Sequence, residues 1–307
     1  MSPREIVAKA WAITVKEGSI RKWGFMSAFV ETLLNAKLFI FQAWLIYSYF
    51  WLQDPIGFFT IEKVLFQNLP NWLAVIIYVT FIILLIIEWL FPHMAKGAII
   101  GLAAKSYKKE EVKGGFVLGL YNFWPIFAIH ELLFLSGLTT VITLSSLSLR
   151  YGAEAGILGV GIIMSIWTLA NVLEFFWIFS EEAVVIRKTG IRGAISKSFK
   201  LVISHIGHIV FLCLLLFFIF LRIIANLLMI ILIPAIVMGV GVSLAFIMPK
   251  IVGYSVAVLL GIIIIFLASY FFAYLEVFRQ TVWTITYIEL SKLKELDVIE
   301  EDADVTK

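Results

Sequence analysis

The stretch "NWLAVIIYVTFIILLIIEWLFP", residues 71–92, decides the fold class. It carries one charged residue, Glu88, and it lacks the polar–apolar alternation of a half-buried strand. A helix needs about 20 apolar residues to cross the hydrocarbon core of a bilayer. Because backbone N–H and C=O groups find no water in that core, a crossing segment must satisfy them internally, as a helix does. The stretch therefore predicts a transmembrane helix.

Five further apolar runs of this kind occur, so we expect an all-α protein, a polytopic transmembrane bundle of six helices. The composition agrees, since 62% of the 307 residues are hydrophobic and 15% are charged, against about 25% charged in soluble domains. The net charge of +3 does not indicate nucleic acid as a partner, and the single cysteine excludes an intrachain disulfide. We expect one transmembrane domain, residues 1–294, and an acidic cytoplasmic tail, residues 295–307. The predicted helices span residues 25–52, 71–92, 116–148, 156–180, 206–232 and 251–278.

The basic residues of the connecting segments predict the orientation of the chain. The segment before the first helix holds five Lys or Arg residues, and so do the second and fourth connections, whereas the other three connections hold one each. Basic loops stay on the cytoplasmic side of a membrane. The alternation therefore predicts a multi-pass protein of the plasma membrane with both termini in the cytoplasm.

A basic, small-residue phrase is written twice: "GLAAKSYKKEEVKGGF" begins at Gly101 and "GAISKSFKLVISHIGH" begins at Gly193. We interpret the chain as three tandem helical hairpins, with short interfacial helices on the cytoplasmic side whose small residues press against the bundle. Gly115 and Gly207 are expected to permit the bend into the bilayer. Two readings of the lysines stay open, orientation signals alone or contacts with anionic lipid headgroups or a membrane partner. These lysines are Lys105, Lys108, Lys197 and Lys200.

The second, fourth and sixth predicted helices each end with one carboxylate, namely Glu88, Glu174 and Glu276. We expect these carboxylates near the cytoplasmic face, together with Glu31 of the first helix. Pairing with Lys or Arg of the interfacial segments is the favoured interpretation. A cation site is the alternative, although no ligand spacing in the sequence indicates one.

Ionisable residues inside a membrane are rare and usually face the interior of the bundle. Lys37, Glu131 and Arg222 lie 13 to 16 residues after the glycines that start their helices, or about 20–24 Å along them. We expect Glu131 to pair with Arg222 or Lys37 in an ionic clasp, or these residues to form a polar, proton-relaying pathway. Asn226 follows Arg222 by one turn. His130 is expected about 100° around the helix from Glu131, so that the two do not easily serve one point.

The segment "FSEEAVVIRKTGIRGAISKSFKLVISHIGHIV", residues 179–210, carries a resemblance to a known family. It resembles the six-helix membrane domain of glycerophosphodiester phosphodiesterases and related uncharacterised bacterial and archaeal integral membrane proteins. The positions that match are Glu182, Gly190, Ala194 and Ser198. The resemblance implies a six-helix membrane domain without an established activity, because those phosphodiesterases carry catalysis on a separate soluble domain.

The sequence contains no recognisable set of catalytic residues. It contains no His-Glu-x-x-His, Gly-x-Ser-x-Gly or phosphate-loop motif. His205 and His208 share a helical face but have no Cys or carboxylate near them in sequence, so we interpret them as interfacial polar residues. We expect no enzyme, no cofactor and no metal. The function expected first is a non-enzymatic membrane protein that contacts lipid headgroups or a membrane partner, and the alternative is a small-solute or ion transporter that uses the mid-membrane charges.

Overall fold

A computed structural model describes residues 1–47, 66–67, 69–151, 156–217, 239–240, 243 and 250–293. In this part of the chain every regular element is a helix, so the all-α prediction is confirmed there. After α10 the chain continues as a helix over Ile206–Phe217. The labelled elements are α1 Pro3–Lys16, α2 Gly18–Tyr47, α4 Asn71–Tyr107, α5 Gly115–Tyr121, α6 Phe123–Leu132, the 3₁₀ turn η2 Phe134–Ser136, α7 Leu138–Tyr151, α8 Gly156–Phe176, α9 Ser180–Arg187, α10 Ile191–Ser204 and α12 Lys250–Leu293.

Three stretches of the described chain are long and apolar enough to cross a membrane: Asn71–Tyr107, Gly156–Arg187 and Leu259–Lys292. A fourth crossing results if α10 and Ile206–Phe217 form one span, although the two are bent by 92°. The prediction of a membrane protein is thus confirmed at this level. The six-helix arrangement of three hairpins stays a prediction, because residues 218–232 of the fifth predicted helix lie outside the described residues, as do residues 294–307 of the tail.

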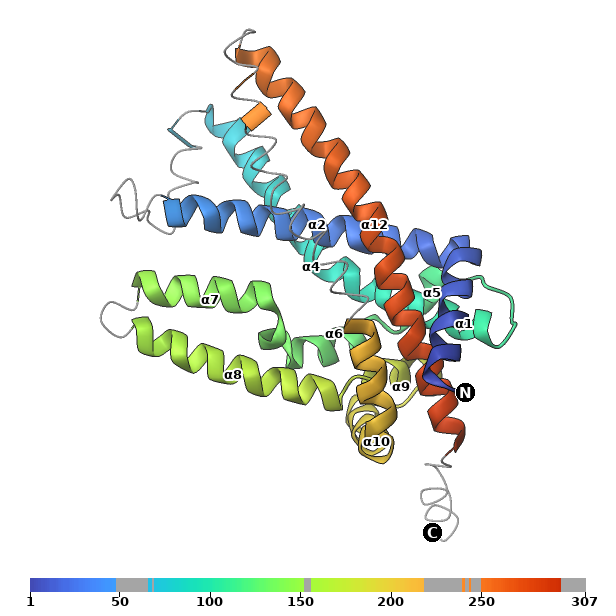
Figure 1. Ribbon diagram of the computed structural model, residues 1–307. Coiled ribbons are helices and arrows are strands. Elements are labelled where there is room, and N and C mark those ends of the chain that lie inside the picture. Colours follow the sequence, from blue (N-terminus) through green and yellow to red (C-terminus); the bar gives the residue numbers. More distant parts are fainter. Residues whose placement is uncertain are drawn as a thin grey trace, which may run out of the picture.

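The helices form two regions with different surfaces, a fanned part and a packed end. Helices α2, α4, α7, α8 and α12 fan out from a packed end that contains α1, α5, α9 and α10 (Figure 1). In the fanned part, large apolar side chains are exposed along residues 72–89 of α4, 157–173 of α8 and 252–271 of α12. Exposed apolar surface of this extent suits contact with lipid.

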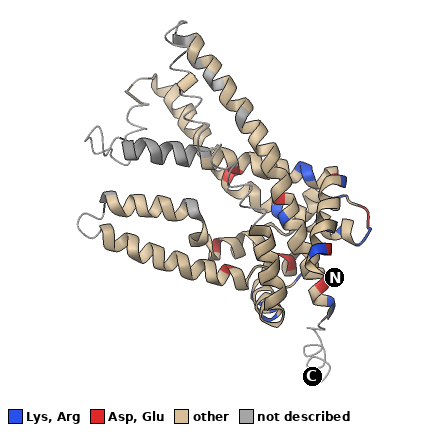
Figure 2. Ribbon diagram, in the orientation of Figure 1, with Lys and Arg blue, Asp and Glu red and all other residues tan. Residues whose placement is uncertain are grey.

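The packed end has a core that joins segments far apart in sequence. Its members are fully or almost fully buried and include Ile6 of α1, Ile99 of α4, Phe179, Leu201 of α10 and Ile285 of α12. The N-terminus and the described end of α12 both lie here (Figure 1). Most Lys and Arg residues drawn in Figure 2 also gather at this end.

The third predicted helix, residues 116–148, is wrong as a single element, because the chain there forms α5, α6, η2 and α7. The first break, at Tyr121 and Asn122, lies four residues before Pro125, whose ring clashes with the carbonyl of the residue four positions earlier in a regular helix. The second break lies at Gly137, which has an extended backbone with φ −66° and ψ 127°.

The two copies of the repeated phrase adopt different structures. The first copy is not a separate interfacial helix. Helix α4 continues past Pro92, and Gly101–Tyr107 form its C-terminal end. Residues 97–104 are buried in the packed end, and burial of these small and apolar side chains stabilises the longer helix. The second copy does begin in a short helix, α10, with Ala194, Ser198 and Leu201 on its buried face.

The bends predicted at Gly115 and Gly207 lie elsewhere. The chain turns before α5 at Gly114, whose φ of 82° is in the left-handed region that favours glycine. Gly115 instead lies so close to Trp23 that a Cβ would overlap the indole ring. The 92° bend after α10 occurs at His205, two residues before Gly207. Gly207 lies inside the following helix, where a Cβ would meet open space.

Helices α2 and α12 approach each other closely, and this contact forms one wall of the site described next. A Cβ on Gly24 of α2 would overlap the side chain of Val277 of α12. The rings of Phe25 and Phe266 lie edge to face with centroids 5.0 Å apart. Arg21 donates a hydrogen bond to the hydroxyl of Tyr274.

Candidate functional site

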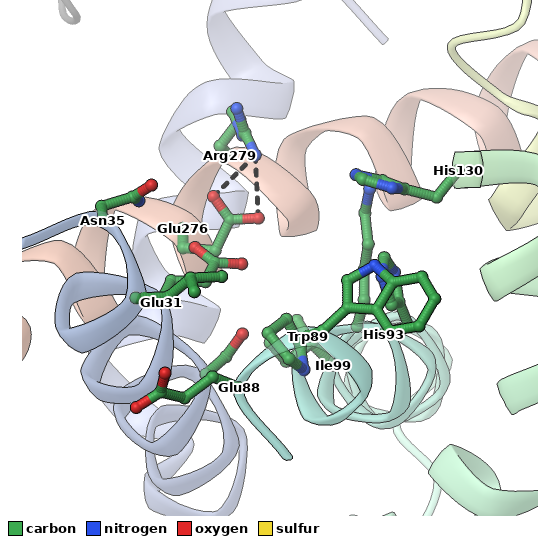
Figure 3. A pocket seen from close by; sticks show the side chains of 13 residues that line it. Glu31, Asn35, Glu88, Trp89, His93, Ile99, His130, Glu276 and Arg279 are labelled. Atoms are coloured by element: carbon green, nitrogen blue, oxygen red, sulfur yellow. Dashed lines mark hydrogen bonds and ion pairs between the residues drawn. The ribbon is translucent and has the colours of Figure 1, made fainter. Parts of the chain in front are cut away.

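A cavity of about 210 Å³ lies where the fanned helices enter the packed end. One water molecule needs about 10–15 Å³ of such volume, so the cavity has room for several waters. Helices α2, α4, α6 and α12 contribute the lining, and Figure 3 shows its polar side chains facing one another. The lining residues are Ser27, Glu31, Leu34, Asn35, Glu88, Trp89, Pro92, His93, Lys96, Ile99, His130, Glu276 and Arg279.

Helical periodicity explains why these residues face the same space. Ser27, Glu31 and Asn35 follow one another at intervals of four residues in α2, and so do Glu88, Pro92 and Lys96 in α4. Residues four apart lie on the same face of a helix. Pro92 also removes one backbone donor from α4 at the level of the cavity.

The charges around the cavity are unequal. Three carboxylates line it, Glu31, Glu88 and Glu276, against the two cationic side chains Lys96 and Arg279. Arg279 is paired with Glu276 on its own helix, with Nη2 2.7 Å from Oε2 and 2.9 Å from Oε1.

Lys96 is paired in turn with Glu181 of α9, which lies beyond the cavity lining, with Nζ 2.6 Å from Oε2 and 2.8 Å from Oε1. The described lining thus holds three carboxyl groups and two cationic side chains, and one of these cations, Lys96, is paired with a carboxylate outside the lining.

A second group of side chains adjoins the cavity where α4 faces α6. Oε1 of Glu131 lies 3.8 Å from His93 Nε2 and 3.8 Å from His130 Nδ1. The two imidazole rings are 4.5 Å apart between centroids. The indole N–H of Trp89 donates a hydrogen bond of 3.1 Å to the same Oε1 of Glu131.

The expectation that His130 and Glu131 do not serve one point is therefore wrong. Their Cβ atoms diverge around the helix, but α6 ends at Leu132 and packs against α4. Both side chains reach across this contact toward His93. A Glu side chain has enough rotatable bonds to offset the angle between neighbouring helix positions.

The structure separates the predicted carboxylates into two groups. Glu88 and Glu276 line the same cavity, together with Glu31. Glu174 is exposed on α8 and does not line it. Glu276 is paired with Arg279, one turn along its own helix.

Three residues of the predicted mid-membrane cluster cannot be placed. Lys37 belongs to α2, but its side chain lies outside the described part of the structure. Arg222 and Asn226 fall wholly outside the described residues. The predicted pairing of Glu131 with Arg222 or Lys37 thus stays a prediction, whereas Glu131 does contact Trp89 and lies beside the two histidines.

The lysines of the repeated phrase lie in the packed end and away from the cavity. Lys105 donates a hydrogen bond of 3.0 Å to the backbone carbonyl of Lys113. Lys108 and Lys200 are exposed, and Lys197 is half-buried.

The serines of the same phrase have structural contacts. Ser198 Oγ donates to the carbonyl of Phe176 at 2.9 Å and accepts from the backbone N–H of Phe179 at 3.0 Å, which fixes the turn between α8 and α9. Ser106 Oγ donates to Glu17 at 3.2 Å.

Four ionisable residues in or beside the site were not predicted from the sequence: His93, Lys96, Glu181 and Arg279. A signal was present for two of them. Lys96 lies on the face of Glu88, eight residues on, and Arg279 lies three residues after Glu276. His93 and Glu181 give no such signal, because their partners come from other helices.

No protein-family model, curated protein or solved structure matches this chain. The resemblance to the membrane domain of glycerophosphodiester phosphodiesterases stays a prediction. The function is therefore inferred from the geometry and charge of the cavity.

Proposed function

We propose that this is an integral membrane protein that binds a small cation in the charged cavity between α2, α4, α6 and α12 and moves it across the bilayer. The observation that carries the proposal is the convergence of Glu31, Glu88 and Glu276, from three different helices, on one cavity of about 210 Å³. The proposal corresponds to the transporter alternative predicted from the sequence. The carboxylates that support it differ from the residues predicted at mid-membrane. Of those residues, His130 lines the cavity and its neighbour Glu131 adjoins it.

The position of the cavity supports binding rather than a purely structural clasp. Ionisable groups next to lipid-exposed helix surface are costly, and they usually line a substrate or ion pathway. The Glu276–Arg279 and Lys96–Glu181 pairs are matched charges of the kind that a structural clasp uses. Glu31 and Glu88 belong to neither pair and line a space large enough for water.

The carboxyl groups of the lining select the class of ligand. Negative charge in a cleft with low-dielectric walls concentrates cations there. Two unit charges 4 Å apart interact by about 4 kcal/mol at an effective dielectric constant of 20. Acidic side chains from three helices around one cavity therefore suit a small cation better than an anion.

Contact with anionic lipid headgroups is a second function, favoured by the outer face of α10. Arg192 and Lys200 are exposed there beside the exposed apolar side chains of Phe199 and Ile203. This pattern is typical of a helix that lies in the headgroup layer. Such a contact orients the protein and is compatible with a cation site in the cavity, because α10 contributes no residue to the cavity lining.

Reconstitution into liposomes tests the cation proposal. We expect uptake of radiolabelled sodium or rubidium ions, or of protons followed with a trapped pH dye, to exceed that of protein-free liposomes. Glu31→Gln removes one lining charge and is expected to reduce this uptake at least about tenfold, which corresponds to about 1.4 kcal/mol. The matched control is Glu174→Gln, which removes a carboxylate outside the cavity and is expected to leave uptake unchanged. Uptake that is absent in the unmodified protein, or equal in both variants, contradicts the proposal.

A further inference from the structure

Three side chains with metal-ligating atoms converge between α4 and α6. His93, His130 and Glu131 each offer one such atom, and these atoms all lie within 4.8 Å of one another. We infer that this His–His–Glu cluster, His93, His130 and Glu131, is a binding site for a divalent transition-metal ion. The inference goes beyond the proposed function, because it rests on this geometry and not on cation movement.

The distances favour a shared ligand over direct bonding within the cluster. Each imidazole nitrogen lies 3.8 Å from Oε1 of Glu131, whereas an N–H···O hydrogen bond spans about 2.7–3.2 Å. Metal–ligand bonds of about 2.0–2.2 Å in a tetrahedral site place ligand atoms about 3.3 Å apart. Closing by about half an ångström, the difference from 3.3 Å, therefore brings each imidazole nitrogen to the metal-bound separation from Oε1 of Glu131. The two imidazole nitrogens lie within 4.8 Å of each other.

The side chains have unequal freedom to make that adjustment. His93 is held in place, with 6% of its side chain exposed and its ring edge-on to Phe127 at 5.4 Å. The His130 side chain is 50% exposed, so its ring can rotate without disturbing the core. Glu131 is 28% exposed and adjusts through its own torsions.

The donor set indicates the class of metal. Two imidazoles and one carboxylate suit Zn²⁺, Fe²⁺ and related first-row ions, whereas Ca²⁺ and Mg²⁺ prefer oxygen ligands alone. Three protein ligands leave a further coordination position. Because His93 and His130 also line the cavity, that position is accessible to water or a solute in it.

The surroundings supply the outer contacts that such sites use. Trp89 donates to Oε1 of Glu131 at 3.1 Å and so orients the carboxylate. Lys96 lies one turn from His93 and repels a bound cation, but its charge is compensated by Glu181 at 2.6 Å. Glu31 and Glu88 lie on the opposite side of the cavity (Figure 3).

Equilibrium metal binding by the purified full chain tests the inference. The protein is freed of its affinity tag, treated with chelator and titrated with Zn²⁺ by calorimetry, and Co²⁺ is used to report coordination geometry by absorption. We expect one high-affinity equivalent per chain. His93→Ala, His130→Ala and Glu131→Ala are each expected to weaken binding at least about 100-fold. Trp89→Phe, which removes only the outer contact, is expected to weaken it about 10- to 100-fold.

Matched controls separate the site from nonspecific binding. His205→Ala and His208→Ala remove histidines outside the cluster and are expected to leave the affinity unchanged. If an alanine variant does not give a monodisperse helical protein, Glu131→Gln and His93→Asn, which keep side-chain size, replace it.

The inference is overturned if the unmodified protein binds neither Zn²⁺ nor Co²⁺, if folded cluster variants bind as tightly as it does, or if the His205 and His208 variants lose binding equally. Its outcome is independent of the flux assay. Zn²⁺ binding without sodium, rubidium or proton uptake supports the metal site and contradicts the proposed function. Uptake without Zn²⁺ binding supports the proposed function and overturns the metal site.

Discussion

Replacement of Phe179 by alanine is expected to lower the free energy of unfolding by about 3–5 kcal/mol, the cost of deleting a fully buried aromatic side chain. Phe179 is 0% exposed and lies at the junction of α8 and α9. Its ring lies edge to face with Trp283 at 5.8 Å and close to Tyr287 at 6.0 Å. The backbone N–H of Phe179 is held by Ser198, so the junction has little freedom to collapse into the space left behind.

Unfolding in detergent micelles titrated with dodecyl sulfate, followed by circular dichroism, measures this loss. Phe116→Ala is the matched control, because Phe116 is 59% exposed on α5 and its removal is expected to cost less than about 1 kcal/mol. Equal losses in the two variants contradict the placement of Phe179 at the centre of the packed end.

Lys96→Met is expected to lower the free energy of unfolding by about 3 kcal/mol, at the low end of the range for a broken buried ion pair. The variant leaves Glu181 charged, 12% exposed and without its 2.6 Å partner. The low end of the range applies because 25% of the Lys96 side chain is exposed.

The double variant Lys96→Met with Glu181→Gln tests whether the loss arises from the pair. Removing both charges is expected to recover stability, with an interaction energy of about 0.5–3 kcal/mol in the double-mutant cycle. Lys292→Met serves as control, since it breaks the Lys292–Glu289 pair at the surface, where Lys292 is 63% exposed, and should cost about 0–1 kcal/mol. If the effects of Lys96→Met and Glu181→Gln on the free energy of unfolding simply add, the pair does not contribute to stability.

Hydropathy alone predicted the part of the fold that a bilayer dictates. The second and fourth predicted helices begin where α4 and α8 begin, at Asn71 and Gly156. Helix α4 runs past its predicted end at residue 92, because the chain leaves the lipid-exposed part without leaving the helix, whereas α8 ends at Phe176, before its predicted end at residue 180. Residues 97–104 of α4 are small or apolar and become buried against other segments, which a sequence pattern does not distinguish from an interfacial loop.

Local signals for the broken third helix were present in the sequence. Pro125 and Gly137 lie inside the apolar run, and each accounts for one break. A continuous apolar composition outweighed them in the prediction. Proline alone does not locate a helix boundary, however, because the helix breaks before Pro125 but α4 contains Pro92 in its interior.

The candidate site was predicted in part. Charged residues in apolar runs are rare, and this singled out Glu88, Glu276, His130 and Glu131. The sequence did not show that Glu31, Glu88 and Glu276 face one space, because that depends on how α2, α4 and α12 pack. His93 joins His130 and Glu131 only through the contact between α4 and α6.

Water access to the cavity tests the central claim most directly, because a cation site must be wet and a structural clasp dry. In a Cys213→Ser background reconstituted into liposomes, Asn35→Cys places a thiol at the cavity lining, and Ile262→Cys places one on the apolar outer surface of α12, where Ile262 is 57% exposed. We predict that a membrane-impermeant, positively charged thiosulfonate modifies the Asn35→Cys variant at least about tenfold faster than the Ile262→Cys variant, and faster than an anionic reagent does, since the cavity is acidic. Equal inertness of the two thiols would contradict a water-filled cation site.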